Sequence, residues 1–380
     1  MISIAGSLSM FKQWFRRIHL TLAILMVFFL INLSISGALL VFGKEIQNSI
    51  QSDYWQVKPQ ANFLPLSQLV SIAEASTGHT VKRIQLAPEK DKAWQFQFNS
   101  GQQLSINAFN GDILHRYVEE DSFYGFVMAW HRWLLWRDEA NKKPLKILVS
   151  ITSLLLIIEM LIGLSLWLKP KNRLKRLKIN IKAKPRVKYY QLHTVVGVFA
   201  FIPLLLIAVS GMAFNWQSQI KWGLEALVAQ SVEQIQHPSI ADSEQKLKLD
   251  LAFAQGVKSM DEGELFRIYL PVDDQALKLR VKMPNEFFAY SWIWVNPYSG
   301  EVIETYDAST ANLATRIWNF KYTFHIGDFF GTSFKFLWLL VALLPGAFSV
   351  TGLWLFFKRT RRYKTVQVQA TTKARTKARI

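Results

Sequence analysis

Cysteine is absent from this chain of 380 residues. Its absence excludes disulfides, zinc–thiolate sites, iron–sulfur clusters and the covalent attachment of haem through a Cys-x-x-Cys-His motif. The sequence also has no Gly-x-Gly-x-x-Gly fingerprint, so nothing in it indicates a flavin or nicotinamide domain. A haem in this chain would therefore have to be bound non-covalently, through histidine.

Acidic residues are few, 27 against 45 lysines and arginines, and most of the basic residues gather in three stretches. Residues 169–188 hold ten of them and residues 358–379 hold nine, without a single acid, while Lys12, Arg16 and Arg17 precede the first apolar run. By the positive-inside rule these stretches and both termini lie in the cytoplasm. Because topology accounts for the charge, we expect no nucleic-acid partner.

Four apolar runs are long enough to cross a bilayer, which takes about 20 residues. They are Leu20 to Phe42, Leu145 to Leu168, Leu192 to Phe214 and Phe334 to Phe357. The sequence therefore predicts an α-helical membrane protein whose four spans form a bundle in the lipid bilayer. The expected regions are span 1 (11–43), a first outer domain (44–130), an interfacial segment with span 2 (131–168), a basic loop (169–188), span 3 (189–215), a second outer domain (216–321), an interfacial segment with span 4 (322–357) and a basic tail (358–380).

The two outer segments follow the same plan, which indicates an internal duplication. Each combines one amphipathic helix with four short strands, a pattern that predicts a small α+β domain. The turn that begins at Asn107 and reaches Gly111 is echoed by the turn from Asn296 to Gly300. The predicted helices are 66–76 and 246–260, and the predicted strands are 81–87, 93–98, 102–108, 113–117, 264–270, 276–283, 290–295 and 301–306.

Four histidines head the four membrane passages. His19 and His193 stand at the cytoplasmic ends of spans 1 and 3, and each is followed 18 residues later by a glycine, Gly37 or Gly211. Since 18 residues make five helical turns, each glycine lies on the face of its histidine. That bare patch would either give a flat bulky group room or allow close helix packing. His131 and His325 lead back into the membrane from the outer face.

These His-led spans, the Asn-x-x-x-Gly turns of the outer segments, and the span ends at Gly163-Leu-Ser-Leu-Trp167 and Gly352-Leu-Trp354 resemble the PepSY-associated transmembrane helix family. The resemblance covers nearly the whole chain. It implies a bacterial inner (plasma) membrane protein with two periplasmic PepSY-like domains, often iron-regulated. Some members look like ferric-siderophore reductases that carry haem in the membrane.

Haem iron accepts two axial imidazoles, and helix bundles build such sites from facing helices. Pairing residues at equal depth predicts two b-type haems per chain, one held by His19 and His193 and one by His131 and His325. Met128 is a substitute ligand at the outer site. The remaining histidines (His79, His115 and His237) have no partners at ligand spacing, and we interpret them as ordinary.

Glu159 lies inside span 2, where a carboxylate is costly and marks a functional position by default. It could accept a hydrogen bond from the non-ligating nitrogen of an axial imidazole. Alternatively, it could serve as a proton or quinol contact, or it could be protonated and bonded to a neighbouring helix.

The first functional hypothesis is an oxidoreductase that reduces a periplasmic ferric siderophore or other ferric chelate. Its electrons would come from a quinol or a cytoplasmic reductase, because the chain has no donor domain of its own. The alternative is a membrane-anchored PepSY-domain protein that binds or regulates a peptidase without redox activity. A transporter has less support, because we expect unbroken spans and only Glu159 is a clearly placed acid within them.

Overall fold

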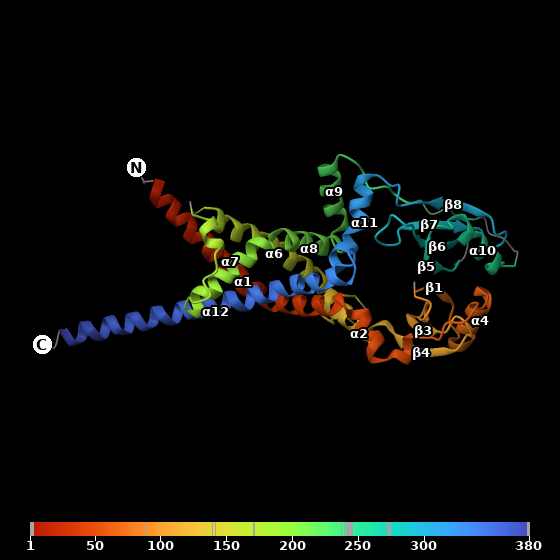
Figure 1. Cartoon of the computed structure of the whole chain (residues 1–380), viewed down its shortest axis with the longest axis horizontal. Coiled ribbons are helices and arrows are strands. Elements are labelled where there is room, and N and C mark those ends of the chain that lie inside the picture. The colour runs from red at the N-terminus through yellow and green to blue at the C-terminus, as the bar shows by residue number, and fades with distance from the viewer. Residues whose placement is uncertain are drawn as a thin grey trace. The chain divides into compact units, whose positions relative to one another are not determined.

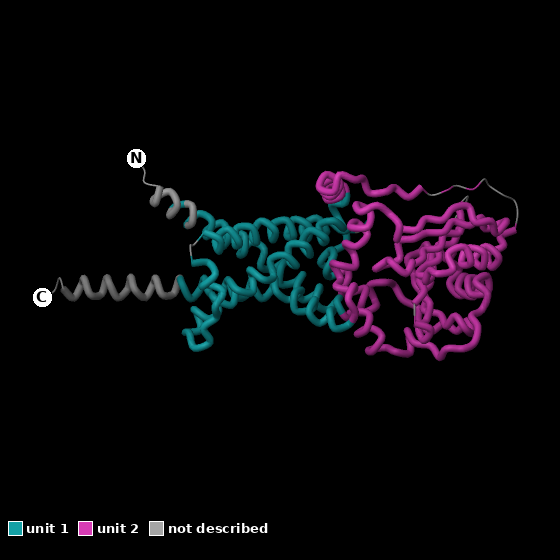
Figure 2. Tube along the Cα trace, turned by 45° about the horizontal axis from the view of Figure 1, so that its top comes forward, with its two compact units in different colours: residues 1–41, 130–217, 332–380 teal, residues 42–129, 218–331 magenta. Residues whose placement is uncertain are grey.

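The apolar helices and the β-strands separate into two units of the computed structural model (Figure 2). Unit 1 comprises residues 1–41, 130–217 and 332–380, and unit 2 comprises residues 42–129 and 218–331. The structure describes residues 4–377 except 88, 139, 141, 170, 171, 237, 239, 241–245 and 272–274. One predicted feature, His237, lies outside the described residues.

Unit 1 is helical. Three of its helices have segments long and apolar enough to cross a membrane, 13–41, 146–168 and 332–359. α1 packs against α6 and α12, α6 against α8, and α7 against α12 (Figure 1). The helices are α1 (Ile4–Val41), α6 (Lys146–Leu168), α7 (Pro185–Phe199), α8 (Phe201–Ala213) and α12 (Thr332–Lys377), with a 3₁₀ turn η2 (Leu174–Leu177).

The segment expected to be span 3 is broken rather than straight. α7 ends at Phe199, α8 begins at Phe201, and the two axes differ by 64°. Pro203 gives the physical reason, because a proline lacks an N–H group and its ring clashes with the carbonyl four residues earlier, here that of Phe199. The expectation of unbroken spans is therefore wrong here, and one of the two arguments against a transporter does not hold. Counted as one bent span, α7 and α8 make a fourth crossing.

Small residues let α1 and α12 approach closely. The hydroxyl of Ser34 accepts a hydrogen bond of 2.7 Å from the backbone N–H of Gly346, which follows Pro345 inside α12. A Cβ atom added to Gly346 would lie 3.1 Å from the Ser34 side chain, closer than ordinary van der Waals contact. Such small-residue seams are typical of helix pairs in lipid, where packing replaces the hydrophobic effect.

All eight predicted strands form in unit 2, but they join one sheet instead of two separate domains. The strand order is β4-β3-β2-β1-β5-β6-β7-β8, and every pairing is antiparallel. The two halves meet where β1 pairs with β5, with Ile84 opposite Ile268. The strands are β1 (Val81–Gln85), β2 (Trp94–Phe98), β3 (Gln102–Ile106), β4 (Ile113–Val118), β5 (Glu264–Tyr269), β6 (Leu277–Lys282), β7 (Ser291–Val295) and β8 (Val302–Tyr306).

One helix from each half covers the same face of this sheet. α4 (Leu66–Thr77) contacts β1, α10 (Leu249–Ser259) contacts β6, β7 and β8, and the two helices touch each other (Figure 1). Inward side chains of the strands and helices form one apolar core. The other elements of unit 2 are α2 (Gly43–Ile50), α3 (Ser52–Trp55), η1 (Glu119–Asp121), α5 (Phe123–Trp133, whose last turn belongs to unit 1), α9 (Gln217–Val228) and α11 (Leu313–Ile326).

The two echoed turns have the same geometry. In each, the glycine N–H donates to the asparagine carbonyl, over 2.8 Å at Gly111 and 2.9 Å at Gly300, and φ of the glycine is +82°. A Cβ atom at Gly111 would also collide with Ile72 of α4, and one at Gly300 with Leu251 of α10. The left-handed backbone and the close helix both require glycine, which explains why the motif occurs once in each half.

Candidate functional site

His19 of α1 faces α6. Its Nδ1 atom lies 3.0 Å from Oε1 of Glu159, and its Cε1 atom lies 3.4 Å from where a Cβ of Gly163 would be. Glu159 and Gly163 are four residues apart and so share one face of α6. The glycine allows the imidazole to approach the helix, and the carboxylate of Glu159, a residue only 9% exposed, lies at ion-pair distance from Nδ1.

His193 of α7 occupies a similar environment on α12. Its Nδ1 atom lies 3.1 Å from the hydroxyl of Thr351, and its Cε1 atom lies 3.9 Å from an added Cβ of Gly352. The ring of Phe348 packs edge-on at 5.0 Å.

The hydroxyl of Thr351 identifies which nitrogen of His193 carries the proton. This hydroxyl donates its only proton to the Ala347 carbonyl at 2.7 Å, as a threonine in a helix commonly does. It therefore meets His193 with a lone pair and accepts a hydrogen bond from Nδ1–H. The neutral imidazole then presents the lone pair of Nε2, the form in which histidine binds a metal.

His131, in the last turn of α5, docks on α1 in the same manner. Its Nδ1 atom lies 3.0 Å from the hydroxyl of Ser36, which donates its proton to the Asn32 carbonyl at 2.6 Å. An added Cβ at Gly37 would lie 3.2 Å from the Cε1 atom of His131. Trp130 reinforces the docking, because its indole N–H donates to the Asn32 side chain at 3.0 Å.

A common arrangement thus recurs three times. An oxygen atom holds the Nδ1 position of the imidazole, and a glycine one or four residues further along the same helix makes room for Cε1. For His131 and His193 the pair is a hydroxyl residue followed directly by glycine, Ser36-Gly37 and Thr351-Gly352. Oxygen partners of this kind fix the tautomer and the ring orientation of metal-binding histidines.

His19 and His193 differ in the residues that contact them. Gly163 and Gly352 are equivalent, and the residue four positions before each is Glu159 in α6 but Phe348 in α12. His19 therefore contacts a carboxylate where His193 contacts an aromatic ring. The histidine and the glycine thus occur in both places, whereas the carboxylate occurs in one.

The histidines lie at two levels of unit 1. His131 contacts Ser36 and Gly37, which stand 17 and 18 residues beyond His19 on the same helix. At 1.5 Å per residue, the two levels are about 25 Å apart along α1. This distance is close to the hydrocarbon thickness of a bilayer, so the two histidines stand near opposite ends of the apolar segment.

The remaining predicted positions lie in unit 2. His325 is the second-last residue of α11, which ends at Ile326 before the left-handed cap Gly327, and its pairing with His131 stays a prediction. Met128 lies in α5, and its role as a ligand also stays a prediction. His79 is exposed, while His115 stacks on Tyr54 at 3.9 Å and burial lowers its pKa, as in an ordinary packed histidine.

Sequence reasoning missed the partners of two histidines. Neither Ser36 nor Thr351 was predicted as a partner, although the Ser-Gly and Thr-Gly pairs are visible in the sequence. A hydroxyl residue before glycine in an apolar run is the signal that could have found them.

Comparison with curated proteins gives no match. The model of one protein family, described as the PepSY-associated TM region, matches residues 16–359, a range that includes every residue named in these contacts. The chain therefore belongs to the PepSY-associated transmembrane family.

Proposed function

We propose that the chain is a haem-dependent transmembrane oxidoreductase that passes electrons from the cytoplasmic side to a ferric chelate, such as a ferric siderophore, in the periplasm. In this proposal it is a four-span protein of the bacterial inner membrane with both termini in the cytoplasm. Each half of the sheet in unit 2 would be a PepSY-type module on the periplasmic side.

The observation that carries the proposal is the repeated Nδ1 contact. A hydroxyl oxygen is hydrogen-bonded to Nδ1 of His131 and of His193, and a carboxylate oxygen lies 3.0 Å from Nδ1 of His19, so Nε2 is the nitrogen suited to iron in all three. The glycines beside Cε1 let each imidazole lie close against the neighbouring helix. In this proposal His19 and His193 are the inner ligands of haem b, and His131 and His325, the latter on its sequence position alone, are the outer ones, two haems per chain.

Bound haem would supply one-electron transfer. The protein's own residues supply orientation. Thr351 and Ser36 hold their imidazoles through neutral hydrogen bonds, whereas Glu159 holds His19 through a carboxylate. A carboxylate behind an imidazole makes it a more basic ligand, so Glu159 would distinguish the His19 side of the inner site from the His193 side.

The first experiment measures haem in the purified full-length chain. We expect two b-type haems per chain by pyridine haemochrome quantitation. His19→Ala or His193→Ala should remove the inner haem, and His131→Ala or His325→Ala the outer one, while His79→Ala serves as the matched control. Fewer than one haem per chain in protein from haem-replete cells would leave the PepSY-domain binding protein as the better account.

The second experiment tests direction. Oriented proteoliposomes hold a reductant inside and a ferric chelate outside, and a ferrous-iron trap records the product. Loss of either histidine pair should stop the reduction. In this proposal electrons pass through the inner haem and then the outer haem. That order is wrong if His19→Ala protein reduces the outer chelate from the inner donor at the wild-type rate.

A further inference from the structure

The sheet face that α4 and α10 leave uncovered carries arginines. Ile84 and Ile268 point into the apolar core. Because side chains alternate along a strand, their neighbours Arg83 and Arg267 point to the opposite face. Arg280 of β6 joins them, since it stands directly opposite Arg267 in the register. We call Arg83, Arg267 and Arg280 the arginine cluster.

Aromatic rings and polar groups surround this cluster. The Arg280 guanidinium lies 5.1–5.8 Å from the centres of four rings. The Arg267 side chain donates to Gln85 at 2.6 Å and to the Tyr269 hydroxyl at 3.0 Å. The four rings around Arg280 are Phe266, Phe288, Tyr290 and Trp292.

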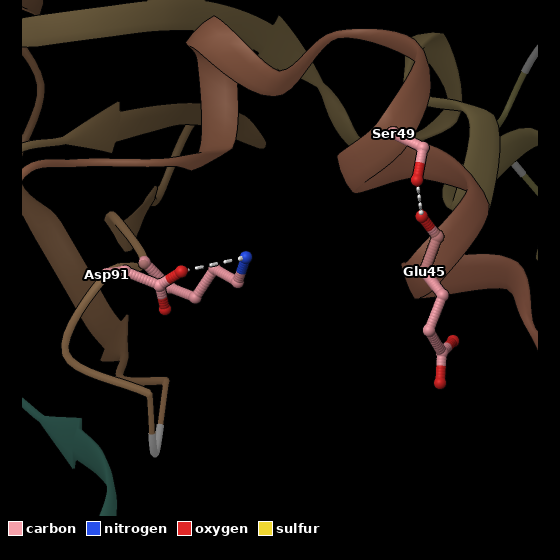
Figure 3. Close-up of polar contacts among 4 residues, drawn as sticks. Glu45, Ser49 and Asp91 are labelled. Carbon is pink, nitrogen blue, oxygen red and sulfur yellow. Dashed lines mark hydrogen bonds and ion pairs between the residues drawn. The ribbon is translucent and has the colours of Figure 1, made fainter. Parts of the chain in front are cut away.

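No acidic residue in the described part of the chain forms an ion pair with the arginine cluster. The ion pair described in unit 2 joins Asp91 and Lys92 (Figure 3), and it involves none of the three arginines. Each guanidinium has five N–H donors, and the hydrogen bonds above take two from Arg267. Arg280 donates one more, from Nε to the Ala289 carbonyl. Donors for a further ligand therefore remain.

The charges of the cluster are held at a cost. Burial lowers the pKa of Arg83 and of Arg280 below the ordinary value, and at Arg83 the charge of Glu119 offsets this only in part. Burial alone would raise the pKa of the Tyr269 phenol, yet Arg267, Arg280 and Arg83 together lower it. The face therefore has a strongly positive potential, which a bound anion would neutralise.

We propose that the arginine cluster binds an acidic ferric chelate, one whose iron is held by carboxylate or catecholate oxygens. The choice of a ferric chelate rests on the proposed function, whereas the anionic character rests on the cluster alone. Guanidinium groups bind carboxylate oxygens through paired charge-assisted hydrogen bonds. We call the four rings around Arg280, together with Tyr269, the aromatic wall. Flat catechol rings can stack on it, for example where the ring centres of Tyr269 and Trp292 lie 5.5 Å apart.

A neighbouring cleft is the competing location. It has a volume of about 270 Å³, lies between the 285–290 loop and α11, and shares Phe288 and Tyr290 with the aromatic wall. Its arginine is Arg316, which is exposed. A variant of Arg316 therefore distinguishes the cleft from the cluster.

The test is equilibrium dialysis of a radioiron-labelled linked triscatecholate against the full chain in detergent, without any reductant. Arg267→Gln and Arg280→Gln should each weaken binding about ten-fold, the expected loss for one charge-assisted hydrogen bond. Arg116→Gln is the matched control, because Arg116 lies in the same sheet but donates to the Ser76 carbonyl of α4 on the other face. Arg280→Lys keeps the charge and should retain part of the affinity if Arg280→Gln fails to fold.

Neutral tris(acetohydroxamato)iron should bind at least ten-fold more weakly than the triscatecholate. Equal loss in Arg116→Gln, loss in Arg316→Gln alone, or equally tight binding of the neutral complex would overturn the proposal. Capture of phosphatidylglycerol with the same arginine dependence, and of no chelate, would assign the face to lipid instead. Dialysis needs no electron transfer. If a haem-free chain binds the chelate, the proposed function is refuted, whereas chelate binding at the arginine cluster is still supported.

Discussion

Replacing Thr351 by valine tests whether a hydroxyl holds His193 in its iron-binding form. Valine has the shape of threonine but cannot accept a hydrogen bond from Nδ1–H of His193. The lost hydrogen bond measures 3.1 Å and joins two neutral groups, so it contributes about 1 kcal/mol, and a buried Nδ1–H left without a partner adds a further cost of about 1 kcal/mol or more. A total near 2 kcal/mol corresponds to a roughly thirty-fold loss of affinity, within the range seen for residues behind a metal ligand.

The assay follows haem transfer from the purified chain to excess apomyoglobin. A His131→Ala background restricts loading to the inner site, and Thr351→Val should then release haem about thirty-fold faster. Thr194→Val is the matched control, because Thr194 is next to His193 and makes the same bond to a carbonyl four residues earlier, that of Tyr190. Equal release rates in the two variants, with equal melting temperatures, would refute the assignment of the Nδ1 proton.

Three further predictions concern packing and charge. Gly37→Val should shift the optical spectrum of the outer site, because its Cβ would lie 3.2 Å from His131, whereas Gly197→Ala, whose Cβ would lie 4.0 Å from Phe348, should leave all spectra unchanged. Gly111→Ala and Gly300→Ala should each destabilise unit 2 by about 1–3 kcal/mol, since both add a collision to a left-handed backbone, and Gly78→Ala, with no atom within 4 Å of its added Cβ, should cost less in the same thermal-melting series. Burial lowers the pKa of Lys321 from 10.5 to about 8, so the native state loses its proton before the unfolded state does, and stability should rise between pH 8 and 10.5; melting curves of wild type and Lys321→Met would show this rise in the wild type alone.

The strands of unit 2 were predictable because the sequence signals for strands and turns are local. Alternating residues and the Asn-x-x-x-Gly turns placed all eight strands within a few residues of their observed bounds. The pairing of β1 with β5 was not predictable, because two four-stranded halves look the same in sequence whether or not they join. The break at Ala200 could have been expected from Pro203, but the apolar run around that proline has no other interruption.

The candidate site was predictable in its histidines but not in their partners. Repetition singled out His19 and His193, and the high cost of a charge in lipid singled out Glu159. The contact between Glu159 and His19 was one of three alternatives, and only the packing of α6 against α1 selects it. The Thr-Gly pair points to Thr351, but the pair alone does not identify His193 as its partner, because a hydroxyl in a membrane helix usually bonds only to its own helix.

The seam between β1 and β5 has a consequence for the order in which this protein is made. About 180 residues, including α6, α7 and α8, separate the two strands. At 5–20 residues per second, a ribosome needs roughly 10–40 s to deliver β5 after β1. Throughout that interval the first half of the sheet has an open edge, and such edges invite pairing with other chains. Lys82 and Arg83 lie on that edge strand, and their charges would discourage a nascent chain from pairing with a wrong strand before its own second half arrives.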